Sequence, residues 1–273
     1  MINAKSTSET FEHLSNLLRN NKRVFFSRFG DGDFFIMDRK DQRNHRFSEE
    51  LHREMLESFW IEDPLYLKAV AVNYPRERFM TRGCLAPFQD NGHFEQIVRK
   101  SMKEHNNGPF ENFIVFHYYA AFKSKLMNNF LDEFIRSKKV LYIGGVEKQN
   151  VEKVVGPNVK TIKTPIKDAY HEIDTWWPEV LKHLNNTEVI IPSAGMASRI
   201  INKRLWDLGI ELHSIDIGSL FDAVSGKNTR TWIKFLGHRM QSVVLPQYQT
   251  KSIRKNLKHL ILDTRYFIRT LYR

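Results

Sequence analysis

The first regular pattern along the chain is a helical one. Phe11, Leu14, Leu17 and Leu18 recur at intervals of three, three and one residues, which predicts a helix over residues 9–20 with one apolar face. Ser6 and Glu9 have the spacing of a capping box at its start. Further helices are predicted by the same kind of pattern at residues 49–60, 93–105, 120–136, 147–155, 169–184 and 196–208.

Short apolar runs between these helices predict strands. They cover residues 23–29, 67–72, 113–116, 140–143, 159–163, 189–191 and 212–217, and most of them stop at glycine or proline. Strands that alternate with helices indicate a mostly parallel sheet with helices on both faces. We therefore expect an α/β, Rossmann-like domain over residues 1–246 and a helical appendage over residues 247–273.

The sharpest candidate for chemistry follows the first strand. Arg28 and Gly30 lead into Asp31, Gly32 and Asp33, so two carboxylates are separated by one glycine. Both could face a shared Mg²⁺ or Mn²⁺, because these hard ions prefer oxygen ligands. Arg28 could bind a phosphate through two hydrogen bonds. The spacing by itself favours a plain β-turn, because Gly-Asp-Gly-Asp is also good turn chemistry.

Two later loops are candidates for binding a nucleotide donor. Gly144 and Gly145 follow one predicted strand, and Ser193, Gly195 and Met196 follow another. Ligands of parallel sheets bind beyond the carboxyl ends of the strands, and the helix that follows can receive phosphate. Taken alone, Gly144 and Gly145 are better explained as ordinary turn glycines between a strand and a helix, and no complete dinucleotide or Walker motif is present.

The last predicted strand ends in a third candidate segment. Asp216 precedes Gly218 and Ser219, and Arg230 follows further along the chain. An acidic residue at a strand end could bind a hydroxyl or a metal, or it could cap the next segment. His117, expected just past a strand, is a weaker catalytic candidate, since such histidines are more often packed polar residues.

Charge and cysteine content limit the alternatives. The formal net charge of +11 favours anionic partners, such as nucleic acid, anionic lipid or phosphate-bearing substrates. The single cysteine, Cys84, fits a reducing compartment, and the polar N-terminus has no signal-peptide pattern, so a cytoplasmic location is expected. A methyltransferase that uses Gly144 and Gly145 and a nucleic-acid-binding protein remain alternatives, although no nucleic-acid module is recognisable and no specific nucleic acid is expected.

Together the three segments resemble the bacterial glycosyltransferases of GT-D type, long classed as a domain of unknown function. That family has Arg-Phe-Gly-Asp-Gly-Glu after its first strand, a Met-Ala-containing turn before a helix, and a strand that ends in Ile-Asp-Ile/Val-Gly-Ser. The matching segments here are residues 28–33, 193–197 and 215–219, followed by Thr229 and Arg230. Three ordered motifs favour the functional interpretation of Asp31 and Asp33 over a plain turn.

The resemblance implies a Rossmann-like fold and a Mn²⁺ or Mg²⁺ ion held by Asp31 and Asp33. It also implies transfer of a sugar from a nucleotide diphosphate sugar, such as a UDP-hexose, to a glycan or lipid-linked glycan acceptor. Two residues depart from the family pattern. Asp33 replaces a glutamate, which shortens the carboxylate by one methylene, and Asp168 replaces an asparagine, which weakens the expectation of a donor contact there.

The end of the chain carries much of the excess charge. Residues 251–273 contain seven Lys and Arg against one acid, and apolar residues recur at mostly three- and four-residue intervals. A basic amphipathic helix suits an anionic membrane surface, so peripheral contact with the inner membrane face is one expectation. A terminal helix that packs its apolar stripe on the domain fits the same pattern.

Overall fold

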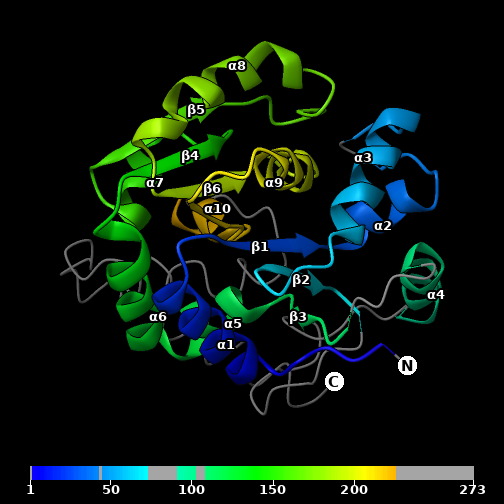
Figure 1. Ribbon diagram of the computed structural model, residues 1–273, viewed down its shortest axis with the longest axis horizontal. Helices are drawn as coiled ribbons and strands as arrows, with labels where there is room; N and C mark the ends of the chain where they lie inside the picture. Colours follow the sequence, from blue (N-terminus) through cyan, green and yellow to red (C-terminus); the bar gives the residue numbers. More distant parts are fainter. Residues whose placement is uncertain (1, 43–44, 73–90, 103–107, 226–273) are drawn as a thin grey trace, which may run out of the picture.

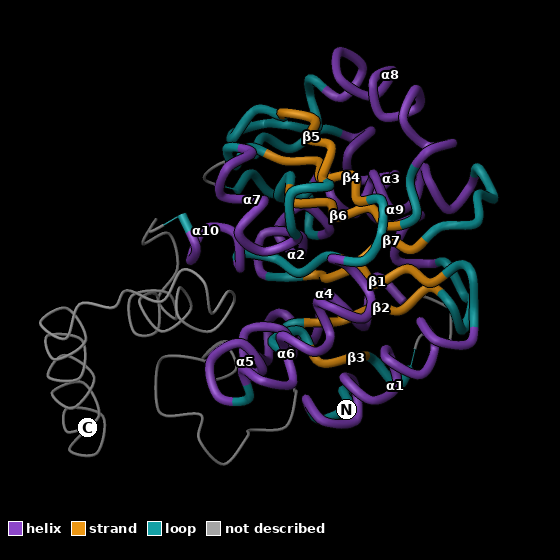
Figure 2. Tube along the Cα trace, turned by 90° about the vertical axis from the view of Figure 1, so that its left-hand side faces the viewer, coloured by secondary structure: helices purple, strands orange, loops and turns teal. Residues whose placement is uncertain are grey.

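In a computed structural model of the chain, the described residues are 2–42, 45–72, 91–102 and 108–225. They form a sheet of seven strands in the order β3-β2-β1-β7-β6-β4-β5, and every strand pair is parallel. Figure 2 shows the strands stacked from β5 at one edge to β3 at the other. This confirms the predicted α/β, Rossmann-like class.

The strands are β1 (Val24–Phe29), β2 (Tyr66–Val70), β3 (Glu111–Asn112), β4 (Val140–Gly144), β5 (Val159–Lys163), β6 (Val189–Ser193) and β7 (His213–Ile215). The helices before β4 are α1 (Thr7–Asn20), α2 (Asp31–Met37), α3 (Glu49–Trp60), α4 (Asn91–Met102), α5 (Val115–Phe122), α6 (Ser124–Leu131) and the π-helical turn η1 (Asp132–Arg136). Those after it are α7 (Lys148–Val155), α8 (Ile173–His183), the 3₁₀ turn η2 (Leu184–Asn186), α9 (Ala197–Asp207) and α10 (Leu220–Val224).

Two apolar cores lie on the two faces of the sheet (Figure 1). Successive residues of β1 alternate between them: Val24 and Phe26 join the core under α1, α5, α6, α7 and α10, whereas Phe25 and Phe29 join the core under α2, α3, α4, α8 and α9. Strands buried on both faces read as continuous apolar runs. Among the described strands of five residues or more, only the edge strand β5 has exposed residues, Lys160 and Lys163.

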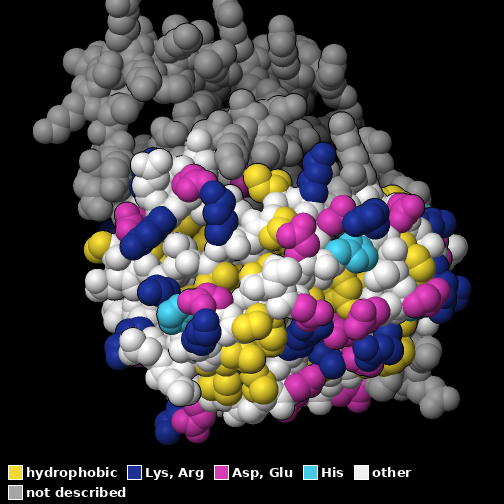
Figure 3. All heavy atoms as spheres, turned by 90° about the horizontal axis from the view of Figure 1, so that it is seen from above, with side chains coloured by type: hydrophobic (Ala, Val, Ile, Leu, Met, Phe, Trp, Pro, Cys, Tyr) yellow, Lys and Arg dark blue, Asp and Glu magenta, His cyan; other side chains and the backbone are white. Residues whose placement is uncertain are grey.

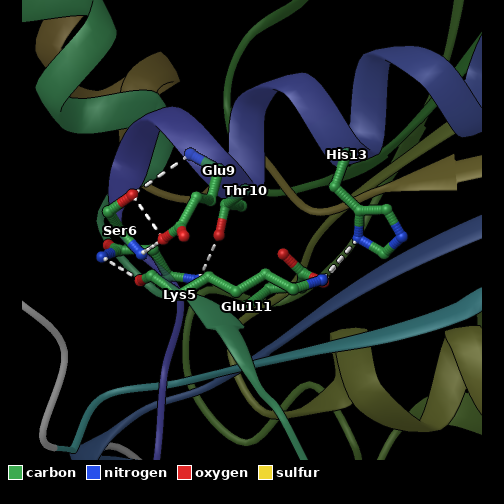
Figure 4. Close-up of polar contacts among 7 residues, drawn as sticks. Lys5, Ser6, Glu9, Thr10, His13 and Glu111 are labelled. Carbon is green, nitrogen blue, oxygen red and sulfur yellow. Dashed lines mark hydrogen bonds and ion pairs between the residues drawn. The ribbon is translucent and has the colours of Figure 1, made fainter.

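The N-terminal segment continues the sheet beyond β3. Ala4 bridges Phe110 in parallel, and the Lys5 amide donates to the Phe110 carbonyl at 2.8 Å. Figure 4 shows Lys5 and His13 meeting at Glu111, whose Oε1 lies 2.6 Å from Lys5 Nζ and 2.8 Å from His13 Nδ1. The capping box of Ser6 and Glu9 is present, as predicted. These contacts cover the β3 edge with the chain's own N-terminus.

The predicted strand at residues 113–116 is wrong. Strand β3 is the polar pair Glu111–Asn112, and the apolar run after it begins helix α5. The Asn112 side chain accounts for the change, because its Oδ1 accepts the amide hydrogen of Ile114 at 3.1 Å and turns the chain out of the strand. His117 therefore lies within α5 rather than just past a strand. The single helix predicted at 120–136 is divided at Lys123 between α5 and α6, and α6 continues directly into the π-helical turn η1.

The β-turn that the spacing alone favoured at Asp31–Asp33 is not formed, because helix α2 begins directly at Asp31. Asp33 Oδ2 accepts the Gly30 amide hydrogen at 2.7 Å, so the third helical residue caps the helix start through its own carboxylate. Gly32 obscured this helix in the sequence, since glycine is a poor helix former. No helix of the described residues is long and apolar enough to span a bilayer. The proposed appendage at 247–273 lies outside the described residues.

Candidate active site

The three motifs meet at one edge of the sheet, where β1, β7 and β6 lie side by side and end. The Cβ that a side chain at Gly32 would carry lies 3.1 Å from Met196 Cε, so the first turn of α2 contacts the loop after β6. A Cβ at Gly218 would lie 1.9 Å from Arg28 Nη1, so the end of β1 contacts the loop after β7. This is the edge at which parallel α/β sheets bind their ligands.

Arg199, in the first turn of α9, connects the acidic residues of this edge. Its Nη2 lies 3.1 Å from Asp33 Oδ2, and its Nη1 lies 3.3 Å from Asp216 Oδ2. Nη1 also donates to the Gly195 carbonyl at 2.9 Å. All three charged side chains are nearly buried, with side-chain exposures of 9% for Arg199 and 5% for each aspartate. One guanidinium therefore joins the start of α2 to the loops that follow β6 and β7.

Asp33 is the most perturbed carboxyl group of the site. Burial raises its pKa to about 6, although Arg199 and the Gly30 amide pull the pKa down. Its Oδ2 accepts from both of these groups, while Oδ1 is buried and has no hydrogen-bond partner among the described residues. A buried carboxylate oxygen without a donor costs free energy unless a ligand satisfies it. Asp33 Oδ1 is thus suited to bind a cation or a hydroxyl group.

The residues around Asp33 determine which ligands a metal ion would find there. No group of three or more His, Cys, Asp or Glu residues that could hold a metal occurs in the described part of the chain. Residues two apart on a helix point to different faces, so Asp31 and Asp33 do not face each other as a strand-end turn would have allowed. Mg²⁺ and Mn²⁺ nevertheless need only one or two carboxylates when phosphates and waters complete the coordination. The buried Oδ1 of Asp33 fits that requirement.

Arg28 is packed rather than extended toward solvent. Its guanidinium lies 4.2 Å from the centre of the Phe113 ring, and its Nη1 is 3.3 Å from His117 Nε2. Guanidinium groups only donate, so His117 Nε2 is the acceptor and the ring proton lies on Nδ1. Ser219 Oγ is 3.5 Å from the same Nε2. The structure therefore brings together Arg28, His117, Gly218 and Ser219 beside the carboxylates.

The glycines of the site are required by backbone conformation or by close packing. Gly195 and Gly218 have φ values of +61° and +65°, a region that side chains rarely adopt. A Cβ at Gly195 would lie 2.9 Å from the His45 ring. A Cβ at Gly144 would lie 2.7 Å from the Ser193 carbonyl on β6. A role of these glycines in donor binding stays a prediction, since chain packing already requires each of them.

Asp168, the departure from the family's asparagine, has φ +52°, a conformation that Asn and Asp tolerate better than most residues. Its Oδ1 accepts the Arg46 amide hydrogen at 2.8 Å, and its Oδ2 lies 3.5 Å from the Arg46 side chain. The negative charge is therefore compensated within the chain. Arg230, the remaining predicted donor contact, lies outside the described residues, as does Cys84.

Sequence reasoning did not identify Arg199. One signal was available: the residue lies in the first turn of a predicted helix, where the helix dipole disfavours a positive charge. A local conflict of this kind often marks a functional position. The aspartates that compensate it come from segments far away in sequence, so the pattern within α9 could not reveal them.

Comparison with known proteins agrees with this geometry. The family model described as "Glycosyltransferase GT-D fold" matches residues 26–223. A solved structure described as "A New Glycosyltransferase (DUF1792) from Streptococcus sanguinis" is similar with a TM-score of 0.63 and 18% identity, over 83% of this chain and 84% of that one. A second, described as "The highly conserved domain of unknown function 1792 has a distinct glycosyltransferase fold", has a TM-score of 0.60 and 18% identity, over 82% and 80%. No curated protein sequence matches significantly.

The structural likenesses establish the fold, and the family match covers most of the chain, including all three motifs. The methyltransferase and nucleic-acid-binding alternatives lose their basis, because a glycosyltransferase family model matches most of the chain. The face shown in Figure 3 does not support nucleic-acid binding either, because its Lys and Arg side chains are interspersed with Asp and Glu over the described part. The chain belongs to the glycosyltransferase family of GT-D fold and is a glycosyltransferase.

Proposed function

We propose that this glycosyltransferase moves a sugar from a nucleotide diphosphate sugar, a UDP-hexose in the first instance, to a hydroxyl group of a glycan or lipid-linked glycan. The observation that carries the proposal is the buried cluster of Asp33, Arg199 and Asp216 at the carboxyl edge of the sheet. A nucleotide sugar needs its diphosphate neutralised and its sugar oriented. Cationic and anionic groups in one buried cluster are suited to both tasks.

A divalent ion, Mn²⁺ or Mg²⁺, is part of the proposal. Asp33 would hold it through Oδ1, with the donor phosphates and water completing the coordination, whereas Asp31 points to another face of α2 and would act on the ion only through its nearby charge. Such an ion neutralises charge on the nucleoside diphosphate leaving group while the glycosidic bond breaks. Asp33 is one methylene shorter than the glutamate of the family pattern, which sets its carboxylate closer to the α2 backbone.

The chain's own residues divide the remaining work. Arg28 and Ser219 are the proposed contacts to the donor phosphates or ribose, held from behind by Phe113 and His117. Further proposed donor contacts lie at the carboxyl ends of β4 and β6 or just after them: Gly144, Gly145, Ser193, Gly195 and Met196.

Asp216 is proposed to orient a hydroxyl group rather than to accept a proton from it. Its Oδ1 accepts the Gly218 amide hydrogen at 2.8 Å, and its Oδ2 faces Arg199. Both oxygens already face donors within the chain, so the carboxylate is better placed to orient a hydroxyl group than to take up its proton. His117 Nε2 likewise faces Arg28, which favours a role in holding that arginine.

A donor screen tests the proposal. Purified protein is incubated with UDP-, GDP- and TDP-sugars, with and without Mn²⁺, and release of the nucleoside diphosphate is measured. We expect release from one class of donor, dependent on Mn²⁺ and lost in Asp33→Asn. Binding of S-adenosylmethionine with no nucleotide sugar bound or consumed would overturn the proposed donor class.

A lipid-linked acceptor would explain the basic C-terminal sequence. Residues 251–273 have the charge and periodicity of a membrane-surface helix, and each basic residue near an anionic surface contributes about 1 kcal/mol. Peripheral contact with the inner face of a membrane would bring the enzyme to such acceptors.

A further inference from the structure

We propose that Arg199 is a positioning residue that joins three segments, the start of α2 and the loops after β6 and β7, into one rigid unit and thereby fixes the direction of Asp33 Oδ1. Each of its three contacts belongs to a different segment: Asp33 in the first turn of α2, the Gly195 carbonyl after β6, and Asp216 after β7. The expected effect of Arg199 on metal and donor binding rests on the proposed function, whereas its effect on the rigidity of the three segments does not.

The contacts on Asp33 determine how the carboxylate is oriented. Arg199 Nη2 and the Gly30 amide both bind Oδ2, at 3.1 and 2.7 Å. Two donors on one oxygen fix the rotation of the carboxylate and leave Oδ1 as the oxygen available to a ligand. Without Arg199, only the Gly30 contact would hold Oδ2, and the carboxylate could turn about its last torsion, which is intrinsically broad.

Helix α9 gives the guanidinium a rigid support. The Arg199 carbonyl accepts the Ser58 hydroxyl hydrogen at 3.1 Å, which ties this turn of α9 to α3. One turn further along, Asn202 Oδ1 accepts the Ser214 hydroxyl hydrogen at 2.6 Å, which ties α9 to β7. Both contacts are buried. The arginine therefore projects from a fixed backbone, as a residue that positions others requires.

Charge compensation and positioning predict opposite effects on metal binding. A guanidinium beside a cation site repels a divalent ion, so removing its charge should strengthen metal binding if compensation of the aspartates were its whole role. If Arg199 positions Asp33, its removal should weaken metal binding, as loss of groups that orient metal ligands commonly does. The sign of the change therefore separates the two roles.

Hydrogen–deuterium exchange of the purified protein tests whether Arg199 holds the three segments rigid. The variants are Arg199→Gln, which removes the charge, and Arg199→Lys, which keeps the charge but lacks the planar guanidinium group. Arg204→Gln is the matched control, because Arg204 lies on the same helix and pairs with buried Glu54 at 3.1 Å, away from the three segments. We expect exchange to rise about tenfold or more in residues 30–37, 193–198 and 215–220 of both Arg199 variants, with no such rise in the control.

Exchange that rises in only one of the three segments would overturn the proposal. If both Arg199 variants unfold, Asp216→Asn takes their place, because it removes one contact of the three. It should then loosen residues 215–220 more than residues 30–37, and equal loosening of both would contradict the proposal.

Calorimetric titration with Mn²⁺ alone tests the consequence for the site. We expect the Kd for Mn²⁺ to rise about tenfold in Arg199→Gln and to stay unchanged in Arg204→Gln. Tighter binding in Arg199→Gln would show charge compensation and overturn the positioning role. If the unsubstituted protein binds no Mn²⁺, the metal part of the proposed function fails, and the exchange result still decides the role of Arg199.

Discussion

Arg28 and Gly218 are in such close contact that a Cβ at Gly218 would lie 1.9 Å from Arg28 Nη1. A side chain at this position would displace the guanidinium from its place between the β7 loop and the Phe113 ring. The relationship explains why the third motif has glycine at position 218, and it links that motif to the arginine of the first.

Gly218→Ala should therefore weaken donor binding. We expect the donor KM to rise about tenfold, because Arg28 must move, and the free energy of unfolding to fall by about 1–3 kcal/mol from the positive φ. Gly209→Ala is the control. Gly209 has φ +69°, and a Cβ there would have no described atom within 4 Å, so this variant bears the backbone strain without the clash. Equal donor KM values for the two variants would show that Arg28 does not contact the donor.

The ion pairs at the N-terminal edge should contribute to stability. Glu111→Ala removes the partner shared by Lys5 and His13, and we expect it to lower the free energy of unfolding by about 2 kcal/mol in urea titration. Glu133→Ala removes an exposed pair with Arg19 and should have a much smaller effect. Similar losses in both variants would contradict a special role for the buried carboxylate.

Lys68 should make stability increase with pH in the alkaline range. Burial lowers its pKa from 10.5 to about 8 in the folded protein. Below pH 8 the lysine is charged in both states and its burial is fully penalised. Between pH 8 and 10.5 the folded state releases its proton first, so stability rises with pH.

Comparison with Lys68→Met isolates this contribution of Lys68. From pH 7 to 9.5, the free energy of unfolding of the unsubstituted protein should rise relative to that of the variant by on the order of 1–2 kcal/mol. Urea titration of both proteins across this range provides the measurement. Parallel pH profiles would refute the prediction.

The C-terminal segment should bind anionic vesicles. Seven basic residues over 251–273 predict co-sedimentation with phosphatidylserine-containing vesicles but not with neutral ones, weakened by salt. A protein truncated after Tyr248 should lose this binding and keep its fold. An intact protein that ignores anionic vesicles, with a truncated one that precipitates, would instead indicate a helix packed on the domain.

The sheet could be predicted from the sequence because its strands are short apolar runs with clear stops. Strand β5 begins and ends where the pattern predicted, and the buried central strands differ by only a few residues. Helix α2 could not be predicted in this way, because a carboxylate cap formed by Asp33 overrides the poor helix propensity of Gly32. Strand β3 was misplaced because Asn112 ends it through a side-chain contact that hydrophobicity does not report.

The site was only partly predictable for a related reason. Asp33, Asp216 and Arg28 stand at strand ends, where parallel topology gathers side chains, and the motifs mark them. Arg199 takes its importance from two aspartates on other elements, one on either side of it in the sequence, which no local pattern contains. Its place in the first turn of a helix was a local sign, but it did not indicate which residues the arginine would contact.

The most direct test of the central claim is metal restoration of sugar transfer. The protein is treated with EDTA, dialysed, and assayed for nucleoside diphosphate release while Mn²⁺ is added back, in parallel with Asp33→Asn and with Arg204→Gln as the folded control. The account predicts activity that disappears with EDTA, returns with Mn²⁺, and stays at least about 100-fold lower in Asp33→Asn at every Mn²⁺ concentration. Full activity in excess EDTA, or an Asp33→Asn variant as active as the unsubstituted protein, would contradict it.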